Sequence, residues 1–394
     1  MKLQLNVAGF LLTMLATPML WSEVASKNLD FSIHQDYIST RAMGMGNAFS
    51  AVVDDHSALF YNPAALARRK DGNIHMQLRG GISGNYLDFV DEISKASEDD
   101  GSGKTEAERL NEVLNKYYGE NFYSRIPTLG FYWMRPNWGI AILPADLTTD
   151  LSVHRQGAPA INLNAYLDTT FAYGYGRNVD WFGIDKIGTL SAGVTVKGIH
   201  RIFASDSVNA LDLVNDSEIF KPSDAAEGFT LDADVGFLFT PDVSGESWWS
   251  LAKPSFAFVV RNLFDYGFNT NFHILDENSK EPPKLQRRID LGSKWDLPDF
   301  WVFDPHLAVD IRDILHDNWS VKKGVHVGAE LYWKMYDWWK GTWTIGLNQG
   351  YPTAGFGARF AWFQIDLVTY ADEVGTESSP EENRRYMVEL SMDF

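Results

Sequence analysis

The last residues of the chain alternate between apolar and polar side chains. One face of the segment 385–394 carries Arg385, Glu389 and Asp393. The other face consists of Tyr386, Val388, Leu390, Met392 and Phe394. Successive side chains of a β-strand point to opposite sides, so this period of two predicts a strand. A soluble protein buries the apolar face in a core, whereas a membrane barrel turns it toward lipid.

The same alternation recurs from Asn73 onward, for example at 231–239 and 325–333. We expect about 14 strands, at 73–87, 125–134, 137–150, 160–176, 188–204, 228–240, 254–263, 286–297, 300–312, 322–334, 341–349, 353–361, 363–371 and 384–394. An even number of strands is typical of bacterial single-chain barrels. The sequence therefore predicts an all-β fold, a transmembrane antiparallel β-barrel over residues 73–394.

The connections between these strands alternate in length. The long ones are expected at 91–124, 151–159, 205–227, 264–285 and 372–383. Short ones lie between them, such as Pro136–Asn137, Leu297–Asp299 and the turn near Trp362, and Gln349–Pro352 is a short exception among the long set. Barrels keep short turns on the periplasmic side, which places both termini in the periplasm. Helical spacing predicts helical insertions in the outer loops near 92–120 and 206–220.

Both ends of the chain indicate export to the outer membrane. Lys2 precedes a mostly apolar run over 3–20, and small residues precede Lys27, so residues 1–26 are expected to be a signal peptide. The alternative, a membrane anchor, is weaker because Pro18 breaks a short run. No later segment has 18 consecutive apolar residues. The alternating strand ending in Phe394 resembles the signal read by the outer-membrane barrel insertion machinery, which we expect as a partner.

Composition narrows the function classes. The 14% aromatic content and 45% hydrophobic content, with a mean hydropathy of -0.22, suit a sheet with one face in lipid and one in water. A net charge of -18 argues against nucleic acid as a partner. The absence of cysteine excludes thiolate metal sites and cysteine nucleophiles. Tryptophans expected at strand ends suggest interfacial girdles, namely Trp138, Trp181, Trp248, Trp249, Trp301, Trp338 and Trp339.

Charged residues on the polar faces are expected to line the lumen. They include Asp232, Asp234, Asp290, Lys294, Asp310, Arg312, Glu330 and Asp366. Such residues form either a polar pathway or ion-paired packing between the wall and a plug. We favour packing, because unpaired buried carboxylates are costly.

The segment before the first strand, residues 27–72, lacks strand alternation and is rich in Gly and Ala. Three parts of it, the run 41–49, the pair Asp54–Asp55 and the run 61–64, are similar to the N-terminal plug of the long-chain fatty-acid outer-membrane transporter superfamily. The branch with type IX secretion shuttle barrels and spirochaetal transporter-like proteins is the most similar. The stretch 346–358 matches a second part. The matching plug residues are Arg41, Gly44, Gly46, Asp54, Asp55, Asn62, Pro63 and Ala64.

This resemblance implies a 14-stranded barrel whose lumen holds residues 27–72 as a plug. It implies passive uptake of hydrophobic small molecules, with ligand received among the outer loops and released when the plug shifts. Leu110, Val113 and Leu114 in the first loop are candidates to receive ligand, or they only pack a helix down. The alternative function is a barrel that binds exported proteins or serves as a subunit of an envelope complex.

Enzymatic chemistry is not expected. Asp54, Asp55 and His56 are adjacent in sequence, and adjacent residues rarely converge on one ion, so we interpret them as structural contacts and predict no metal site. No nucleotide-binding loop or hydrolase motif is present. His306 and His326 alternate with apolar residues and are interpreted as lumenal polar groups. We therefore predict no cofactor, with outer-membrane lipid and a hydrophobic small molecule as partners.

Overall fold

The computed structural model describes residues 31–98, 101, 103–156, 158–181, 183–209, 225–243, 248–268, 274 and 279–394. The predicted signal peptide at 1–26 lies outside the described residues. No helix in the described part of the chain has the length and apolar character needed to span a membrane.

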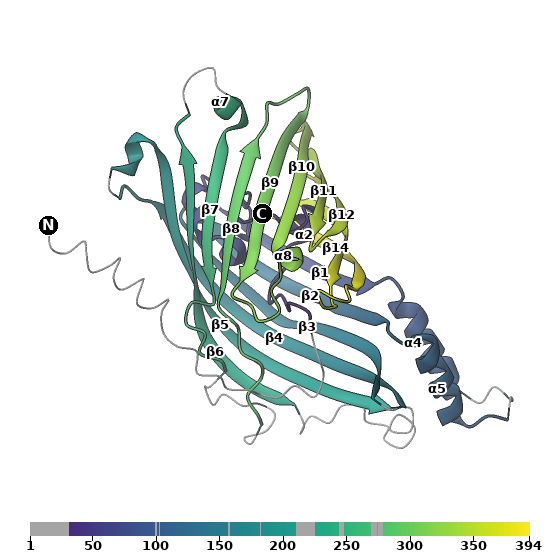
Figure 1. Ribbon diagram of the computed structural model, residues 1–394. Coiled ribbons are helices and arrows are strands. Elements are labelled where there is room, and N and C mark those ends of the chain that lie inside the picture. The colour runs from purple at the N-terminus through teal and green to yellow at the C-terminus, as the bar shows by residue number, and fades with distance from the viewer. Residues whose placement is uncertain are drawn as a thin grey trace.

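The described residues form one closed antiparallel barrel of fourteen strands, as predicted (Figure 1). Each strand pairs with its neighbours in sequence, and β1 pairs with β14 from His75↔Asp393 to Ser83↔Arg385. The strands are β1 (Asn73–Ser83), β2 (Asn121–Arg135), β3 (Trp138–Gln156), β4 (Ala158–Asn178), β5 (Gly188–Asn209), β6 (Ala226–Pro241), β7 (Pro254–Arg261), β8 (Arg288–Asp296), β9 (Phe303–Ile314), β10 (Val325–Tyr336), β11 (Trp339–Asn348), β12 (Tyr351–Phe360), β13 (Phe363–Glu373) and β14 (Glu382–Asp393).

The outer surface of the barrel is apolar and the inner surface is polar. On β14, Leu390 is 38% exposed, whereas its neighbour Glu389 is 5% exposed. The whole predicted apolar face of this strand, from Tyr386 to Phe394, is exposed. An exposed apolar band around a closed sheet is stable only in lipid, so the molecule is a transmembrane barrel of the outer-membrane type.

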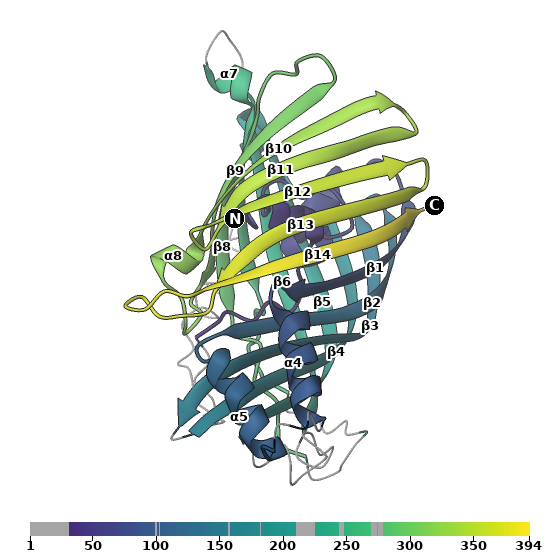
Figure 2. The same cartoon turned by 90° about the vertical axis from the view of Figure 1, so that its right-hand side faces the viewer.

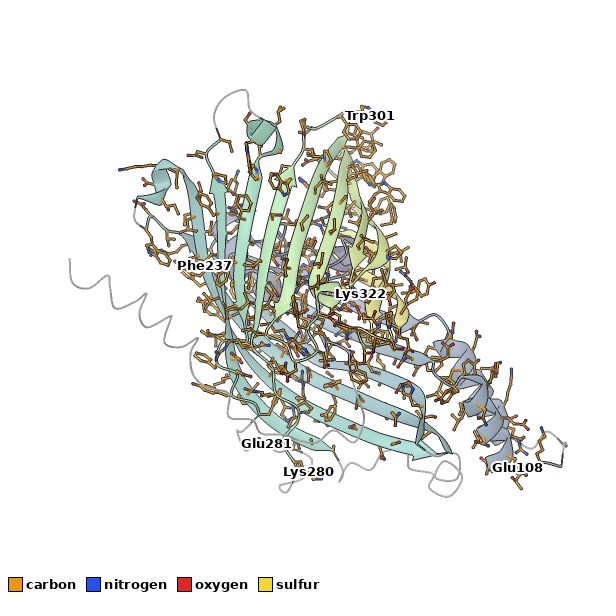
Figure 3. All side chains as sticks on the ribbon, in the orientation of Figure 1. Glu108, Phe237, Lys280, Glu281, Trp301 and Lys322 are labelled. Carbon is orange, nitrogen blue, oxygen red and sulfur yellow. The ribbon has the colours of Figure 1, made fainter. Side chains whose placement is uncertain are left out.

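Exposed aromatic side chains gather at one end of the barrel. This end holds the short β2–β3, β10–β11 and β12–β13 connections, and we call it the turn end. Its exposed indoles include Trp181, Trp301, Trp338 and Trp362. Trp301 lies at this end, whereas Lys280 and Glu281 lie at the opposite, loop end (Figure 3). The turn end is the periplasmic one by the loop-length rule.

The loops differ from the sequence-based expectation in three places. The predicted loop at 151–159 is wrong, because β3 continues to Gln156 and β4 begins at Ala158. The predicted helix near 206–220 is wrong at its start, where β5 continues to Asn209, and the rest lies outside the described residues. In the first loop, α5 (Glu106–Lys116) matches the prediction, but α4 (Tyr86–Ser97) begins where a strand was expected.

The chain between residues 31 and 72 lies inside the barrel, and we call it the lumenal segment (Figure 2). It contains α2 (Thr40–Gly44), α3 (Ala58–Tyr61) and the 3-10 helix η1 (Pro63–Arg68). Helix α2 contacts β11 to β14, and η1 contacts β3 to β6. Among the described residues, the largest apolar cluster joins this segment to wall residues including Tyr132, Leu143 and Leu238. The remaining short helices are η2 (Ile184–Lys186), α7 (Trp248–Ala252) and α8 (Val321–Gly324).

Candidate functional site

Arg41 joins two parts of the lumenal segment to the wall. Its guanidinium donates two hydrogen bonds of 2.6 Å to the two carboxylate oxygens of Glu330 on β10. A third nitrogen lies 2.6 Å from Asp54 and 3.2 Å from Asp55. Paired Arg–carboxylate bonds of this kind are strong and directional. Four of the predicted site residues therefore meet at one point.

Gly44 and Gly46 allow the backbone of the lumenal segment to approach the wall closely. Gly46 has a φ of +61°, in the left-handed region that glycine tolerates. A Cβ atom on Gly346 of β11 would come within 2.5 Å of the Gly46 nitrogen. Thr353 accepts a 3.0 Å hydrogen bond from the Gly46 N–H and donates one of 2.9 Å to the Gly44 carbonyl. Small residues on both sides therefore let two backbones pack directly.

Asn62 fixes the start of η1. Its side-chain oxygen accepts a 3.1 Å hydrogen bond from Ala64 N–H, as at a helix N-cap. Its amide donates a 2.9 Å bond to the Ser50 carbonyl. Pro63 occupies the first helical position, where no N–H is needed. The predicted Asn–Pro–Ala motif thus sets the local fold of the lumenal segment.

The charged residues predicted to line the lumen all lie on the inner side of the wall. Asp290 pairs with Arg261 at 2.7 Å and lies 3.7 Å from Arg312. Asp310 accepts backbone hydrogen bonds of 2.9 and 2.8 Å from residues 49 and 50. Asp234 pairs with Lys197 at 2.8 Å, and Lys294 with Asp296 at 2.9 Å. Asp232 accepts a 2.9 Å hydrogen bond from Phe264 N–H.

Other ion pairs were not predicted from the sequence. Arg201 bridges Asp168 of β4 and Asp36 of the lumenal segment, at 2.6 and 2.9 Å. Burial opposes ionisation of the Asp36 carboxyl, but Arg201 and Arg288 outweigh it and hold its pKa well below its usual range. Because these pairs link the wall to the lumenal segment, the central lumen is packed and ion-paired.

Two larger cavities lie at opposite ends of this packed region. The turn-end cavity, about 450 Å³, is lined largely by charged and polar groups such as Arg41, His75 and Asp393. The loop-end cavity, about 300 Å³, mixes apolar residues such as Phe122 and Leu151 with Asn162 and other polar groups. Two smaller cavities between them are about 20 Å³ each.

The wall has an interruption between β2 and β3, which we call the seam. The strands pair from Asn121↔Ser152 to Arg125↔Thr148, and again from Phe131↔Ile142 to Arg135↔Trp138. Between these two stretches, residues 126–130 of β2 and 143–147 of β3 do not pair with each other. Pro127 and Pro144 lie in the unpaired stretches. Proline lacks the N–H that a sheet ladder needs, so these two residues disfavour pairing there.

The first-loop residues proposed to receive ligand are not free to do so. Leu110 and Leu114 are fully buried in a cluster with Phe89 and Phe122, and Val113 packs against that cluster. The structure therefore supports the alternative that they hold α5 against α4 and the barrel.

In the described part of the chain, two separate clusters of His and carboxylate side chains each bring their ligand atoms within 4.8 Å of one another. They are His34, Asp36 and Asp168, and His56, His75 and Glu389. In the first cluster, Arg201 already pairs with both carboxylates and occupies the place of a cation between them. Burial, and then the Arg201 charge, lower the pKa of His34 well below its usual value.

No protein-family model and no curated protein matches the sequence. Among solved structures, the chain is similar to the Ralstonia pickettii toluene transporter TbuX, with 9% identity, coverage of 91% of this chain and 98% of that chain, and a TM-score of 0.47. It is similar to the CymD monoaromatic hydrocarbon channel, with 9% identity, 89% and 96% coverage and a TM-score of 0.45. It is also similar to the P. putida toluene transporter TodX, with 10% identity, 90% and 97% coverage and a TM-score of 0.40.

Proposed function

We propose that the protein is an outer-membrane channel for passive uptake of hydrophobic small molecules, such as long-chain fatty acids, and that the lumenal segment is its plug. One observation carries the proposal. The loop-end cavity and the seam lie on the same pair of strands, β2 and β3. A ligand bound in the cavity therefore lies on the two strands whose pairing is interrupted at the seam.

A straight path through the lumen does not suit an apolar molecule. The core between the lumenal segment and the wall fills the centre of the barrel. On the turn-end side of that core, the cavity is lined by charged and hydrogen-bonding groups. An apolar molecule gains little from leaving lipid or the loop-end cavity for such surroundings.

The loop-end cavity offers both kinds of contact that an amphipathic ligand needs. Phe31 and Leu151 supply apolar surface. Asn164 and His154 supply hydrogen-bonding groups for a polar end. Small-molecule sites combine apolar surface with placed polar groups, and this cavity offers both kinds of contact.

The seam provides a sideways exit into lipid. Ile126 and Leu129 on β2, and Ile142 on β3, are exposed on the outer surface beside it. The unpaired backbone removes the ladder that elsewhere holds neighbouring strands together. A small separation of β2 and β3 therefore connects the lumen with the bilayer, and the ligand never crosses the polar turn-end cavity.

Uptake of a labelled fatty acid by cells tests the function. Cells that lack their own uptake protein and express this chain should take up the label faster than cells without it. Ser152→Trp places an indole in the loop-end cavity and should lower uptake by about fivefold or more. Ser97→Trp, at the exposed end of α4 and outside the cavity, is the matched control and should keep full uptake.

The binding of exported proteins is a second candidate, favoured by one observation. Helices α4 and α5 project from the side of the barrel, with α4 against β2 and α5 against β4 (Figures 1 and 2). Leu87 and Val90 are exposed on α4. Removal of residues 86–116 should leave uptake intact if the protein is a channel. Unchanged label uptake with and without the full chain, together with a crosslinked protein partner lost on this deletion, would establish the second candidate instead.

A further inference from the structure

Three potential metal ligands from distant parts of the sequence meet in the turn-end cavity. His56 belongs to the lumenal segment, His75 to β1 and Glu389 to β14, the two strands that close the barrel. Their ligand atoms all lie within 4.8 Å of one another. All three residues line the cavity of about 450 Å³.

His75 is held as metal-ligating histidines are held. Its Nδ1 lies 2.9 Å from Asp393 Oδ1. Its Nε2 is buried and has no hydrogen-bond partner in the structure, and the residue is 4% exposed. A carboxylate on one ring nitrogen orients the imidazole and makes the other nitrogen a better ligand. An unpartnered buried nitrogen is otherwise costly.

The charge around Glu389 also favours a bound metal ion. Glu389 lies directly opposite Asp366 in the β13–β14 register. Among the described residues neither carboxylate has an ion-pair partner. Thr40 and Gln364 donate one hydrogen bond each, of 2.8 and 2.7 Å, to Glu389 and Asp366. Two buried carboxyl groups that face each other without an ion-pair partner need either a shared proton or a nearby cation.

Two of the three guanidinium groups that line this cavity already have carboxylate partners, whereas Arg69 donates hydrogen bonds to the Asp54 carbonyl and the Asn73 side chain. Arg41 pairs with Glu330, Asp54 and Asp55. Arg359 pairs with Asp393 at 2.6 Å. These pairs leave a place for a small divalent cation between the two histidines and Glu389.

We propose that His56, His75 and Glu389 bind a divalent transition-metal ion, with Zn²⁺ the best match. Two imidazoles and one carboxylate are a common three-residue zinc set, and the cavity leaves a fourth position for water. Asp393 is the positioning residue for His75. The two histidines and the carboxylate also suit zinc better than Mg²⁺ or Ca²⁺, which prefer oxygen ligands.

Binding requires one movement. The rings of His56 and His75 are stacked, with centroids 3.8 Å apart and planes 17° from parallel. An ion lies in the plane of each imidazole that binds it, so one ring must turn. His56 lies between the short helices of the lumenal segment, whereas His75 is fixed in β1. Rotation of His56 would break the stack and attach the lumenal segment to β1 and β14 through the metal.

Zinc binding by the purified full-length barrel in detergent tests the site. After treatment with a chelator, Zn²⁺ is titrated in competition with a chromophoric chelator, and Co²⁺ is used to record a ligand-field spectrum. We expect one equivalent of tight binding. His75→Asn and Glu389→Gln should each weaken it by more than about 100-fold, and Asp393→Asn by about 10- to 100-fold. His306→Asn, which changes another histidine of the same cavity, is the control and should bind as the wild type does.

A second readout separates a metal site from loss of fold. Circular dichroism should show the same barrel for each variant. Zn²⁺ should slow protease cleavage within residues 31–72 of the wild type and of His306→Asn, but not of His75→Asn. The proposal is overturned if the folded wild type binds no zinc, or if His306→Asn loses as much affinity as His75→Asn.

Discussion

Asp146 of β3 lies 3.1 Å from the Arg125 guanidinium of β2, at the edge of the stretch where these two strands do not pair. The two groups are close without the alignment of a hydrogen bond. Arg79 of β1 approaches the same carboxylate to 3.6 Å and donates a hydrogen bond to the Ile38 carbonyl of the lumenal segment. Asp146 thus joins three strands and the lumenal segment at the seam, where ladder hydrogen bonds are missing.

Replacement of Asp146 should loosen the seam. Asp146→Asn removes the charge that holds two buried guanidinium groups, and the loss of one partner of a buried pair costs about 3 kcal/mol. Denaturant unfolding in detergent should show this loss, and fatty-acid uptake should rise because the strands separate more easily. Lys95→Gln, which removes an exposed ion pair with Asp91 on α4, is the control and should change neither quantity measurably. Equal stability of Asp146→Asn and the wild type would show that the carboxylate does not hold the seam.

Gly346 should be required for the close packing of the lumenal segment against β11. The added methyl of Gly346→Ala would collide with backbone at Gly46, so the lumenal segment must shift, at a cost of about 1–3 kcal/mol. Limited proteolysis should then cut within residues 31–72 faster than in the wild type. Gly84→Ala is the matched control, because its methyl would meet the nearest atom at an ordinary 3.6 Å. Equal cleavage rates for the two variants would contradict the close packing.

Stability should fall as the pH is lowered from about 6.5. Burial, followed by the Arg288 charge, lowers the pKa of His316 to about 3, and His34 is lowered for similar reasons. Unfolded histidine has a pKa near 6.5, so below that pH the unfolded chain binds protons that the folded chain does not. The stabilisation is complete above pH 6.5 and is lost toward pH 3, by about 1.4 kcal/mol per pH unit for each histidine. Unfolding in denaturant from pH 7.5 to 4.5 measures the slope, which His316→Gln should reduce. A flat profile for the wild type would refute this assignment.

Phe394 should contribute to closure of the barrel. Its N–H and carbonyl form two hydrogen bonds of 2.9 Å with Ile74 of β1, and its ring stacks on Trp362 at 6.1 Å. Phe394→Ala keeps the backbone bonds but removes the ring and the C-terminal aromatic of the predicted insertion signal. The amount of folded barrel in the outer membrane should drop severalfold. Phe360→Ala, which removes an exposed ring at the turn end of β12, should have a smaller effect.

The barrel could be predicted from sequence because its strands are amphipathic with a strict period of two. Glu330 and Asp366 were placed in the lumen by that period alone, since one residue of shift would have moved them into lipid. The predicted loop at 151–159 was wrong because Leu151 and Val153 continue the alternation of β3 through residues assigned to the connection.

The sites were less predictable because they depend on contacts across the barrel. Arg201 and Asp36 are 165 residues apart in sequence, and only closure of the barrel around the lumenal segment brings them together. His56 and Glu389 converge in the same way. The sequence contained one local signal for the seam. Pro127 and Pro144 lie inside predicted strands, where proline disfavours pairing.

The central claim is that a hydrophobic ligand leaves the lumen through the seam. The most direct measurement is the uptake rate of a labelled fatty acid by cells expressing the double variant Pro127→Val and Pro144→Val, which restores two N–H donors to the unpaired stretches. Pro352→Val, in the regularly paired strand β12, is the control. If the seam is the exit, uptake falls about tenfold or more in the double variant and stays at the wild-type rate in the control. Wild-type uptake by a correctly folded double variant would contradict the account.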